Sequence, residues 1–337
     1  MKKFDLLIDK YGVGLSVKDG QFHIRHKDSR QTIPVSKIRT IALTKTTNIT
    51  GSAIKLALDN EIDISFIERD GMPFARIWNS KFGSITTIRR HQLAFSQSID
   101  GSKWIKEVII MKIKNQMGMV FKISKETGKQ GPYISRLREK FSKYLLKISS
   151  SNDVDSLDLA NQLRGWEANA SKLYFRALSY NLPQEFQFEK RSKRPALDPF
   201  NAALNYCYGI LYNKIEGMMI RSGLDPHIGI FHKDRYNRPV LVFDVIEIFR
   251  HWAEYPVMEA FISNIMRKEH FEIQKERVFI TPPGRKIIIE LFFSYLNERV
   301  EWQGERTKRI LHIKNYTDNF ANKMKNYKLN DNKTSGI

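Results

Sequence analysis

Apolar and polar positions alternate along the first part of the chain, with the period of two that a half-buried β-strand shows. Residues 21–26 alternate in this way directly after a Lys-Asp-Gly turn at 18–20, so the turn and its flanks predict a hairpin. A helical spacing occurs in this region only at 51–60, where Ser52 is the expected N-cap. The pattern therefore predicts a small β lobe over residues 1–95.

The spacing changes near Phe95 to the longer period of amphipathic helices. Ser102 is the expected N-cap of the first of them, and from there to residue 326 we find only helical and loop patterns. We therefore predict an α+β protein, with an N-terminal small β-sheet lobe followed by a larger all-α lobe over residues 96–326. Residues 327–337 are expected to form a flexible tail.

Basic side chains are in clear excess. The 337 residues include 56 Lys and Arg against 36 Asp and Glu, which gives a net charge of +20. Such a field attracts polyanions, of which nucleic acid is the commonest and an anionic membrane surface is the alternative. No apolar run reaches the roughly 18–20 residues that cross a bilayer, and Asp5 and Asp9 interrupt any N-terminal signal sequence. Nucleic acid is therefore the expected partner.

A single cysteine, Cys207, limits the chemistry further. It excludes an intramolecular disulfide and a cysteine-rich zinc site. This usage fits a reducing compartment, and we expect a cytoplasmic protein.

Two acids lie in an apolar segment where a carboxylate is costly to bury. Asp244 and Glu247 are three residues apart in the sequence VLVFDVIEIF, so they share one side of a helix that should be buried nearly all round. One interpretation is a buried salt bridge to Arg250 or another arginine. The other is a divalent-metal site shared with His232, because carboxylates with one imidazole suit Mg²⁺ or Mn²⁺. On a strongly basic protein, such a site indicates phosphodiester chemistry.

A third acid, Glu167, lies in LRGWEANASKLYFRAL at 163–178. On a helix it lies beside Ala170, Ser171 and Tyr174. An acid in this position is usually a solvated residue at the edge of the apolar face. The residues alone do not connect Glu167 to the other two acids.

Five segments along the chain carry a resemblance to a known family: WEANASKLYF at 166–175, DPFNAALNYCYGILY at 198–212, GLDPHIGIFH at 223–232, RYNRPVLVFDVIEIFR at 235–250 and GRKIIIELF at 284–292. In this order they resemble the Cas-one family, the catalytic integrase subunits of CRISPR spacer acquisition. The order of a β lobe and then a helical lobe is also similar to the family, so the likeness covers nearly the whole chain. Four positions depart from the family pattern: Ala168, Cys207, Ile248 and His251.

The resemblance implies a role for each acid and for the histidine. Glu167, His232 and Glu247 would be the ligands of a Mg²⁺ or Mn²⁺ ion, and Asp244 would be a supporting acid at the same catalytic site. None of the four departures removes a ligand, although Ala168 and Cys207 add bulk that bears on local helix packing.

The resemblance also implies an activity and its partners. The helical lobe would be the catalytic, DNA-binding part of a metal-dependent DNA integrase and endonuclease, a nuclease of CRISPR adaptation and antiviral defence. A DNA 3′-hydroxyl would attack a phosphodiester at the CRISPR repeat, which inserts new spacer DNA by transesterification. The partners would be the protospacer duplex, the repeat DNA and the small Cas-two subunit, and the β lobe would form a homodimer.

Basic residues within or near these motifs are the expected contacts to DNA phosphates. They are Arg191, Lys193, Arg194, Arg235, Arg238, Arg250, Arg285 and Lys286. For any one of them, a merely solvated surface charge is an equally good interpretation.

Two other functions remain open from the sequence. A non-catalytic nucleic-acid-binding protein would account for the net charge but not for the buried acids. A mobile-element integrase of the same fold would account for both, and only its preferred target would distinguish it.

Overall fold

Two compact units make up the chain, Met1–Gly83 and Ser84–Ile337. The division differs from the boundary predicted at residue 95. Phe95 is fully buried and its ring packs edge-on against Phe320, so the helix that carries it belongs to the second unit. The computed structural model describes residues 3–27, 29–78, 86–151, 157–232 and 238–328.

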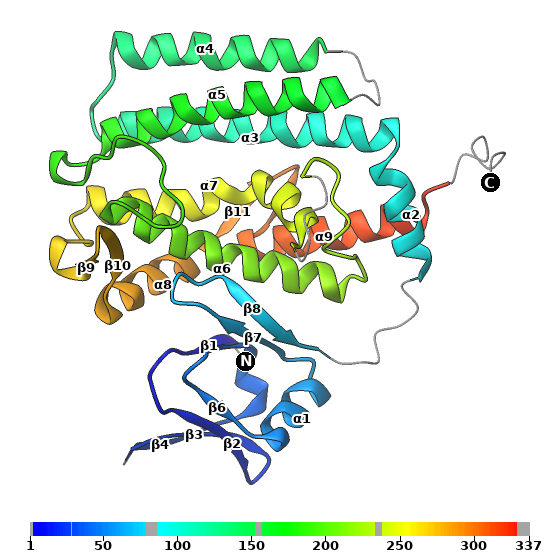
Figure 1. The fold of residues 1–337 in the computed structure, drawn as a ribbon, viewed down its shortest axis with the longest axis vertical. Helices are drawn as coiled ribbons and strands as arrows, with labels where there is room; N and C mark the ends of the chain where they lie inside the picture. Colours follow the sequence, from blue (N-terminus) through cyan, green and yellow to red (C-terminus); the bar gives the residue numbers. More distant parts are fainter. Residues whose placement is uncertain (1–2, 28, 79–85, 152–156, 233–237, 329–337) are drawn as a thin grey trace. The chain divides into compact units, whose positions relative to one another are not determined.

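Two four-stranded sheets form the first unit, as the alternating pattern predicts (Figure 1). One has the order β1-β5-β7-β8, with β1, β5 and β7 parallel; the other has the order β4-β3-β2-β6. The strands are β1 Phe4–Ile8, β2 Gly14–Lys18, β3 Gln21–His26, β4 Ser29–Ile33, β5 Ile38–Thr44, β6 Asn48–Ile49, β7 Asp63–Ile67 and β8 Pro73–Ile77; a short 3₁₀ helix, η1, covers Val35–Lys37.

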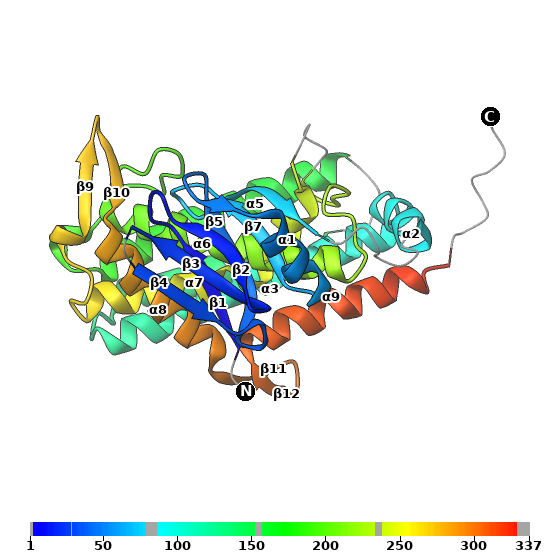
Figure 2. The ribbon, with the colours of Figure 1, turned by 90° about the horizontal axis from the view of Figure 1, so that it is seen from below.

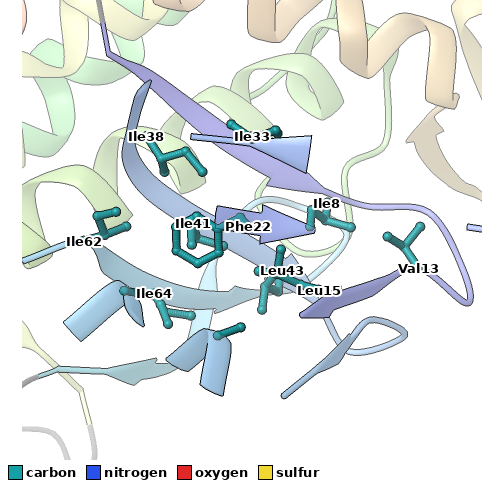
Figure 3. Close-up of a cluster of buried hydrophobic side chains, with 12 residues drawn as sticks. Ile8, Val13, Leu15, Phe22, Ile33, Ile38, Ile41, Leu43, Ile62 and Ile64 are labelled. Atoms are coloured by element: carbon teal, nitrogen blue, oxygen red, sulfur yellow. The ribbon is translucent and has the colours of Figure 1, made fainter. Parts of the chain in front are cut away.

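The core of the first unit consists of apolar side chains contributed by both sheets (Figure 3). Leu15 and Phe22 from one sheet and Ile41 and Ile64 from the other are all fully buried. These residues occupy the inward-facing positions of strands in which apolar and polar residues alternate, so the period of two correctly predicted the strands.

The turn at 18–20 joins β2 to β3, as predicted. Asp19 and Gly20 both have positive φ, 51° and 69°, the conformation that a tight hairpin turn requires. Helix α1, Gly51–Asp59, follows the helical spacing, but its N-cap is Thr50 and not the predicted Ser52.

Helices dominate the second unit, which confirms the predicted α+β class. Helices α3, α4 and α5 pack on one another, and α7 packs against both α3 and α6 (Figure 1). The helices are α2 Thr86–Ser96, α3 Ile99–Glu126, α4 Pro132–Ser149, α5 Leu157–Asn181, α6 Pro199–Arg221, α7 Val240–Ile262, α8 Pro282–Asn297 and α9 Arg309–Lys325, with 3₁₀ helices η2 Gln184–Phe186 and η3 Lys268–His270.

Two features of this unit differ from the prediction. The N-cap of α3 is Ser98, four residues before the proposed cap at Ser102, and its side chain accepts a hydrogen bond from the N–H of Gly101. The unit also contains two short hairpins, of which the first stands out from the helices in Figure 2. Their strands are β9 Phe271–Gln274, β10 Arg277–Ile280, β11 Arg299–Trp302 and β12 Glu305–Lys308.

Within the described residues, every helix is too short or too polar to span a membrane. Residues 329–337 of the predicted tail lie outside the described part of the chain.

Candidate metal centre

Helix α7 carries both acids of the apolar segment into the interior, as predicted. Asp244 is fully buried and Glu247 is 9% exposed. A buried carboxylate needs hydrogen-bond donors or cations, so the partners of these two residues show what each acid does.

Asp244 holds the loop that carries His232. Its Oδ2 accepts hydrogen bonds from the backbone N–H groups of Ile230 at 2.7 Å and Phe231 at 3.0 Å. Its Oδ1 accepts one from the backbone N–H of His232 at 3.1 Å and one from the imidazole Nδ1 at 2.6 Å. Four donors therefore satisfy this carboxylate, which anchors the loop to α7.

The same contact sets the tautomer of His232. Because Nδ1 donates to a carboxylate, we assign its proton to that nitrogen, which leaves the lone pair on Nε2. The side chain is 41% exposed, and Nε2 has no hydrogen-bond partner among the described residues. An imidazole held in this way is a suitable metal ligand.

Glu247 is paired with two cations. Its Oε1 accepts a hydrogen bond from Arg250 at 2.8 Å, and its Oε2 lies 2.6 Å from the ammonium of Lys112 on α3. Burial acts to raise the pKa of Glu247, but the two cations outweigh it and the net shift is downward. The salt bridge expected with Arg250 is thus present for Glu247, whereas Asp244 is bonded to the histidine loop.

Lys112 also joins Glu167 to this cluster. Its ammonium contacts Glu167 Oε1 on α5, and Ser171, one turn farther along α5, donates to the same oxygen at 2.8 Å. Burial acts to lower the pKa of Lys112, but the carboxylates of Glu247 and Glu167 outweigh it and the net shift is upward. Glu167 is therefore part of a charge cluster between α3, α5 and α7, and the interpretation as a solvated edge residue is wrong.

Arg164 connects α5 to the histidine loop. Its Nη2 donates to the carbonyl oxygen of Phe231 at 2.7 Å, and its guanidinium lies 5.1 Å from the centre of the Phe231 ring. Because Arg164 is one turn before Glu167 and Phe231 precedes His232, the three predicted ligands come from neighbouring segments.

The described residues contain no ready-made group of three His, Cys, Asp or Glu side chains that could hold a metal ion. Glu167 and Glu247 both contact the ammonium of Lys112, while the imidazole of His232 contacts Asp244. The donors nevertheless suit a divalent cation, because two carboxylates converge on one positive charge. In addition, the buried Oε2 of Glu247 is paired with the ammonium of Lys112 but accepts no hydrogen bond within the described part of the chain. Ligation by Glu167, His232 and Glu247 stays a prediction.

A third buried acid, Glu254, lies on α7 two turns beyond Glu247. Tyr174 donates to its Oε2 at 2.6 Å and Tyr208 donates to its Oε1. Burial raises the pKa of the Glu254 carboxyl. The guanidinium of Arg250 lies 4.7 Å from the centre of the Tyr208 ring, so this network also positions the arginine that pairs with Glu247.

Arg191, Arg250 and Arg285, three of the bases proposed to bind DNA, are only partly exposed and are held by partners within the fold. The guanidinium of Arg191 donates to Asn201 at 2.7 Å and to Asn205 at 2.5 Å, and burial lowers its pKa. Arg250 is held by the acid cluster, and Arg285 donates to a backbone carbonyl oxygen at 3.2 Å. These side chains therefore have roles within the fold whether or not they also contact DNA.

The other bases are more accessible. Lys193, Arg194, Arg238 and Lys286 are exposed, and Arg235 lies outside the described residues. Partial desolvation of its ammonium group and the guanidinium groups of Arg250 and Arg191 lower the pKa of Lys193, whereas the carboxylate of Glu247 acts to raise it.

Of the two departures that add bulk, one lies at the surface and the other in the core. Ala168 is exposed, so its methyl group adds no bulk to the core. Cys207 is fully buried in α6, and burial raises the pKa of its thiol.

The sequence model of the family described as CRISPR associated protein Cas1 matches residues 6–293. This chain belongs to the Cas1, or Cas-one, family. Its relatives include the CRISPR-associated endonuclease Cas1 1 of Archaeoglobus fulgidus, which is 26% identical over 89% of this chain and 90% of its own length.

Two solved structures show the fold of this Cas1 chain. One is a casposase bound to an integration product, with a TM-score of 0.81 and 20% identity over 98% of this chain and 92% of the casposase. The other comes from a Cas6-RT-Cas1–Cas2 complex, with a TM-score of 0.78 and 18% identity over 96% of this chain and 35% of the longer one.

The sequence did not identify Lys112 or Arg164 as part of the site. Lys112 follows Val108 and Ile109 on the apolar face of α3, so a lysine at that position was a signal of a buried cation. Arg164 had no such signal, because its partner is a backbone carbonyl far along the chain.

Proposed function

We propose that this Cas1-family chain is a metal-dependent DNA integrase and endonuclease that inserts spacer DNA into a CRISPR array. The observation that supports it best is the convergence of Glu167 and Glu247, from two different helices, on one buried cationic position. The endonuclease name of the Archaeoglobus relative and the integration product bound to the casposase agree with this activity.

Glu167, His232 and Glu247 would hold one Mg²⁺ or Mn²⁺ ion. When bound, the ion would supply positive charge to the reacting phosphate and make the attacking hydroxyl more acidic. Asp244 keeps the proton on Nδ1 of His232 and so presents Nε2 as the ligand atom. Arg250 keeps Glu247 ionised.

The reaction requires no protein nucleophile. The 3′-hydroxyl oxygen of the incoming DNA forms a bond to phosphorus at the repeat boundary, and the bond from that phosphorus to the O3′ of the repeat strand breaks. The attacking hydroxyl loses its proton to solvent, and the departing O3′ gains one. One phosphodiester replaces another, so no energy source is needed, and the same site with water as the attacking group would cleave DNA.

The partners follow from charge and from the related complex. The net charge of +20 and the exposed Lys193, Arg194, Arg238 and Lys286 suit the protospacer duplex and the repeat DNA. A Cas2 subunit is a proposed partner, because a structurally similar chain occurs in a Cas1–Cas2 complex. The first unit is a proposed homodimer contact.

The test is integration of a short DNA duplex into a supercoiled plasmid, with and without Mn²⁺. Wild-type protein should join the duplex to the plasmid only with the ion, and Glu167→Gln and His232→Ala should reduce joining at least about 100-fold. Glu259→Ala is the matched control, because Glu259 is an exposed acid on the same helix as Glu247. Joining that is independent of both the ion and these residues would contradict the proposal.

The alternatives give different results in the same assay. A non-catalytic binding protein would shift the DNA in a gel but would neither join nor cleave it under any ion. A mobile-element integrase would join DNA equally well to plasmids with and without a CRISPR repeat.

A further inference from the structure

The ammonium of Lys112 lies between the two carboxylates that are proposed to hold a metal ion. It contacts Glu167 Oε1 and lies 2.6 Å from Glu247 Oε2, so one positive group connects α5 to α7 from its place on α3. Its side chain is 8% exposed, which means that solvent barely screens these contacts.

Polar contacts to α5 and α7 hold α3 in place close to Lys112. Asn115 donates to the carbonyl oxygen of Ile248 at 3.0 Å, which joins α3 to α7 one residue after Glu247. Gln116 lies 3.4 Å from Ser171, which in turn donates to Glu167. The backbone from which Lys112 extends is therefore held in place, whereas its side chain is a flexible four-carbon stem.

A divalent ion and this ammonium cannot share the position. An ion that both carboxylates bind lies about 2.0–2.3 Å from each ligand oxygen, and the ammonium is within hydrogen-bond distance of the same two oxygens. Two cations placed there would overlap or repel each other strongly, because little solvent screens them.

We propose that Lys112 is a built-in counter-ion that holds Glu167 and Glu247 together in the metal-free protein and must leave before a divalent ion binds. Lys112 thereby weakens metal binding and stabilises the metal-free fold. The inference rests on the proposed metal site and adds to it a residue that sets the affinity for the ion.

The test measures Mn²⁺ binding to the full-length protein without DNA, by the electron paramagnetic resonance signal of free Mn²⁺ at one neutral pH. Lys112→Met keeps the length of the side chain and removes its charge. We expect it to bind Mn²⁺ about tenfold more tightly than wild type, or more, and to melt at a lower temperature in chelator. The double variant Glu167→Gln/Glu247→Gln should lose the site.

Lys106→Met is the matched control. Lys106 is also a buried lysine of α3, and it donates to the carbonyl oxygen of Ser151 at 2.7 Å, where no proposed ligand lies. Its replacement should lower the melting temperature and leave Mn²⁺ affinity within about twofold of wild type.

The possible outcomes separate the two proposals. If wild-type binding depends on Glu167 and Glu247 but Lys112→Met binds no more tightly, the counter-ion role is wrong and the metal site stands. If the double variant binds Mn²⁺ as wild type does, or if no variant binds, the metal site fails and the counter-ion role fails with it.

A structure of the wild-type protein soaked with Mn²⁺ covers the case in which Lys112→Met does not fold. The ammonium should then have moved beyond hydrogen-bond distance of at least one of the two carboxylates. An ammonium that still contacts both Glu167 and Glu247 beside a bound ion would overturn the inference.

Discussion

At the scale of one residue, Asp244 is a buried acid whose hydrogen-bond donors all come from the loop that carries His232. Its two oxygens receive three backbone N–H groups and the Nδ1 of His232, so its hydrogen-bonding capacity is filled by the protein. In Asp244→Asn, an amide NH₂ group replaces one of the two carboxylate oxygens, so a donor would face the donors of the histidine loop. We expect the free energy of unfolding to fall by about 2–4 kcal/mol.

The same substitution should weaken Mn²⁺ binding by about 10- to 100-fold, because His232 loses the partner that orients it. Urea denaturation and a Mn²⁺ titration measure the two effects on one sample. A loss of stability with unchanged Mn²⁺ affinity would show that His232 is not a ligand oriented by Asp244.

Gly229 is required by the close approach of two backbone segments in the histidine loop. A Cβ added there would lie 2.6 Å from the carbonyl oxygen of His232 and 2.7 Å from a methyl group of Val240. Gly229→Ala must therefore shift the loop, and we expect it to reduce Mn²⁺ affinity and melting temperature together. Gly165→Ala is the control on α5, where the added methyl group meets nothing within 4 Å. It should stabilise the protein by about 0.5–1 kcal/mol.

His251 is a buried histidine from which we expect a pH dependence of stability. Burial, with help from Arg309, lowers its pKa to about 3 from the ordinary 6.5. Between pH 6.5 and about pH 3, His251 binds a proton in the unfolded chain but not in the folded chain. The free energy of unfolding therefore falls as the pH drops through this range. The slope is at most about 1.4 kcal/mol per pH unit.

We expect His251→Leu to flatten this slope. The measurement is urea denaturation of both proteins at about pH 7 and about pH 5, since the folded histidine is neutral at both. Equal losses of stability in the wild type and the variant would show that His251 is not the group responsible.

At the scale of elements, α3, α5 and α7 contribute two polar layers that are seven residues apart in each helix. The first layer is Lys112, Glu167 and Glu247; the second is Met119, Tyr174 and Glu254, in which the tyrosine donates to the carboxylate and also lies 2.9 Å from the methionine sulfur. Seven residues are close to two helical turns, so each helix presents the same face to both layers. Partners within the packed core, rather than solvent, therefore satisfy the buried acids Glu247 and Glu254.

The basic loop between η2 and α6 divides into a structural and an accessible part. Arg191 is hydrogen-bonded to Asn201 and Asn205, whereas Lys193 and Arg194 are exposed. Replacing Lys193 and Arg194 by Ala should weaken DNA binding and reduce its log–log salt dependence by about 0.9 for each lost duplex phosphate contact. Arg191→Ala should instead lower the melting temperature.

The measurement is DNA affinity by fluorescence anisotropy across a series of salt concentrations. The melting temperature is the internal control: it should stay close to wild type in the double variant, because both side chains are exposed. An unchanged salt dependence in the double variant would assign these two residues to the solvated surface.

The sequence predicted the elements that have a clear pattern of apolar residues or a turn motif. It did not predict the contacts between those elements. The apolar run of α7 predicted burial of Asp244 and Glu247, and the Lys-Asp-Gly turn predicted the first hairpin. The β9–β10 hairpin turns at Lys275 and Glu276, which have positive φ but are not residues that favour it. The pairing of Lys112 with two acids depends on how three helices pack, and no local pattern records that.

At the scale of the whole molecule, the proposed attraction of DNA and the proposed chemistry on DNA rest on different residues. The net charge of +20 is the balance of 56 bases and 36 acids along the entire chain, whereas the proposed chemistry depends on a few buried groups in the second unit. A variant in the acid cluster should therefore lose strand-transfer activity and still bind DNA.

Glu247→Ala tests that separation. The substitution removes one of 36 acids and leaves Arg250 and Lys112 without the carboxylate that pairs with both, so the site becomes more positive. We expect strand transfer into a plasmid to be lost, while the affinity for duplex DNA is equal to wild type or higher, as measured by anisotropy at fixed salt. Glu259→Ala should change neither. If Glu247→Ala joins DNA to the plasmid at the wild-type rate, the acid serves only as the partner of Arg250 and Lys112, and the salt bridge is its whole function.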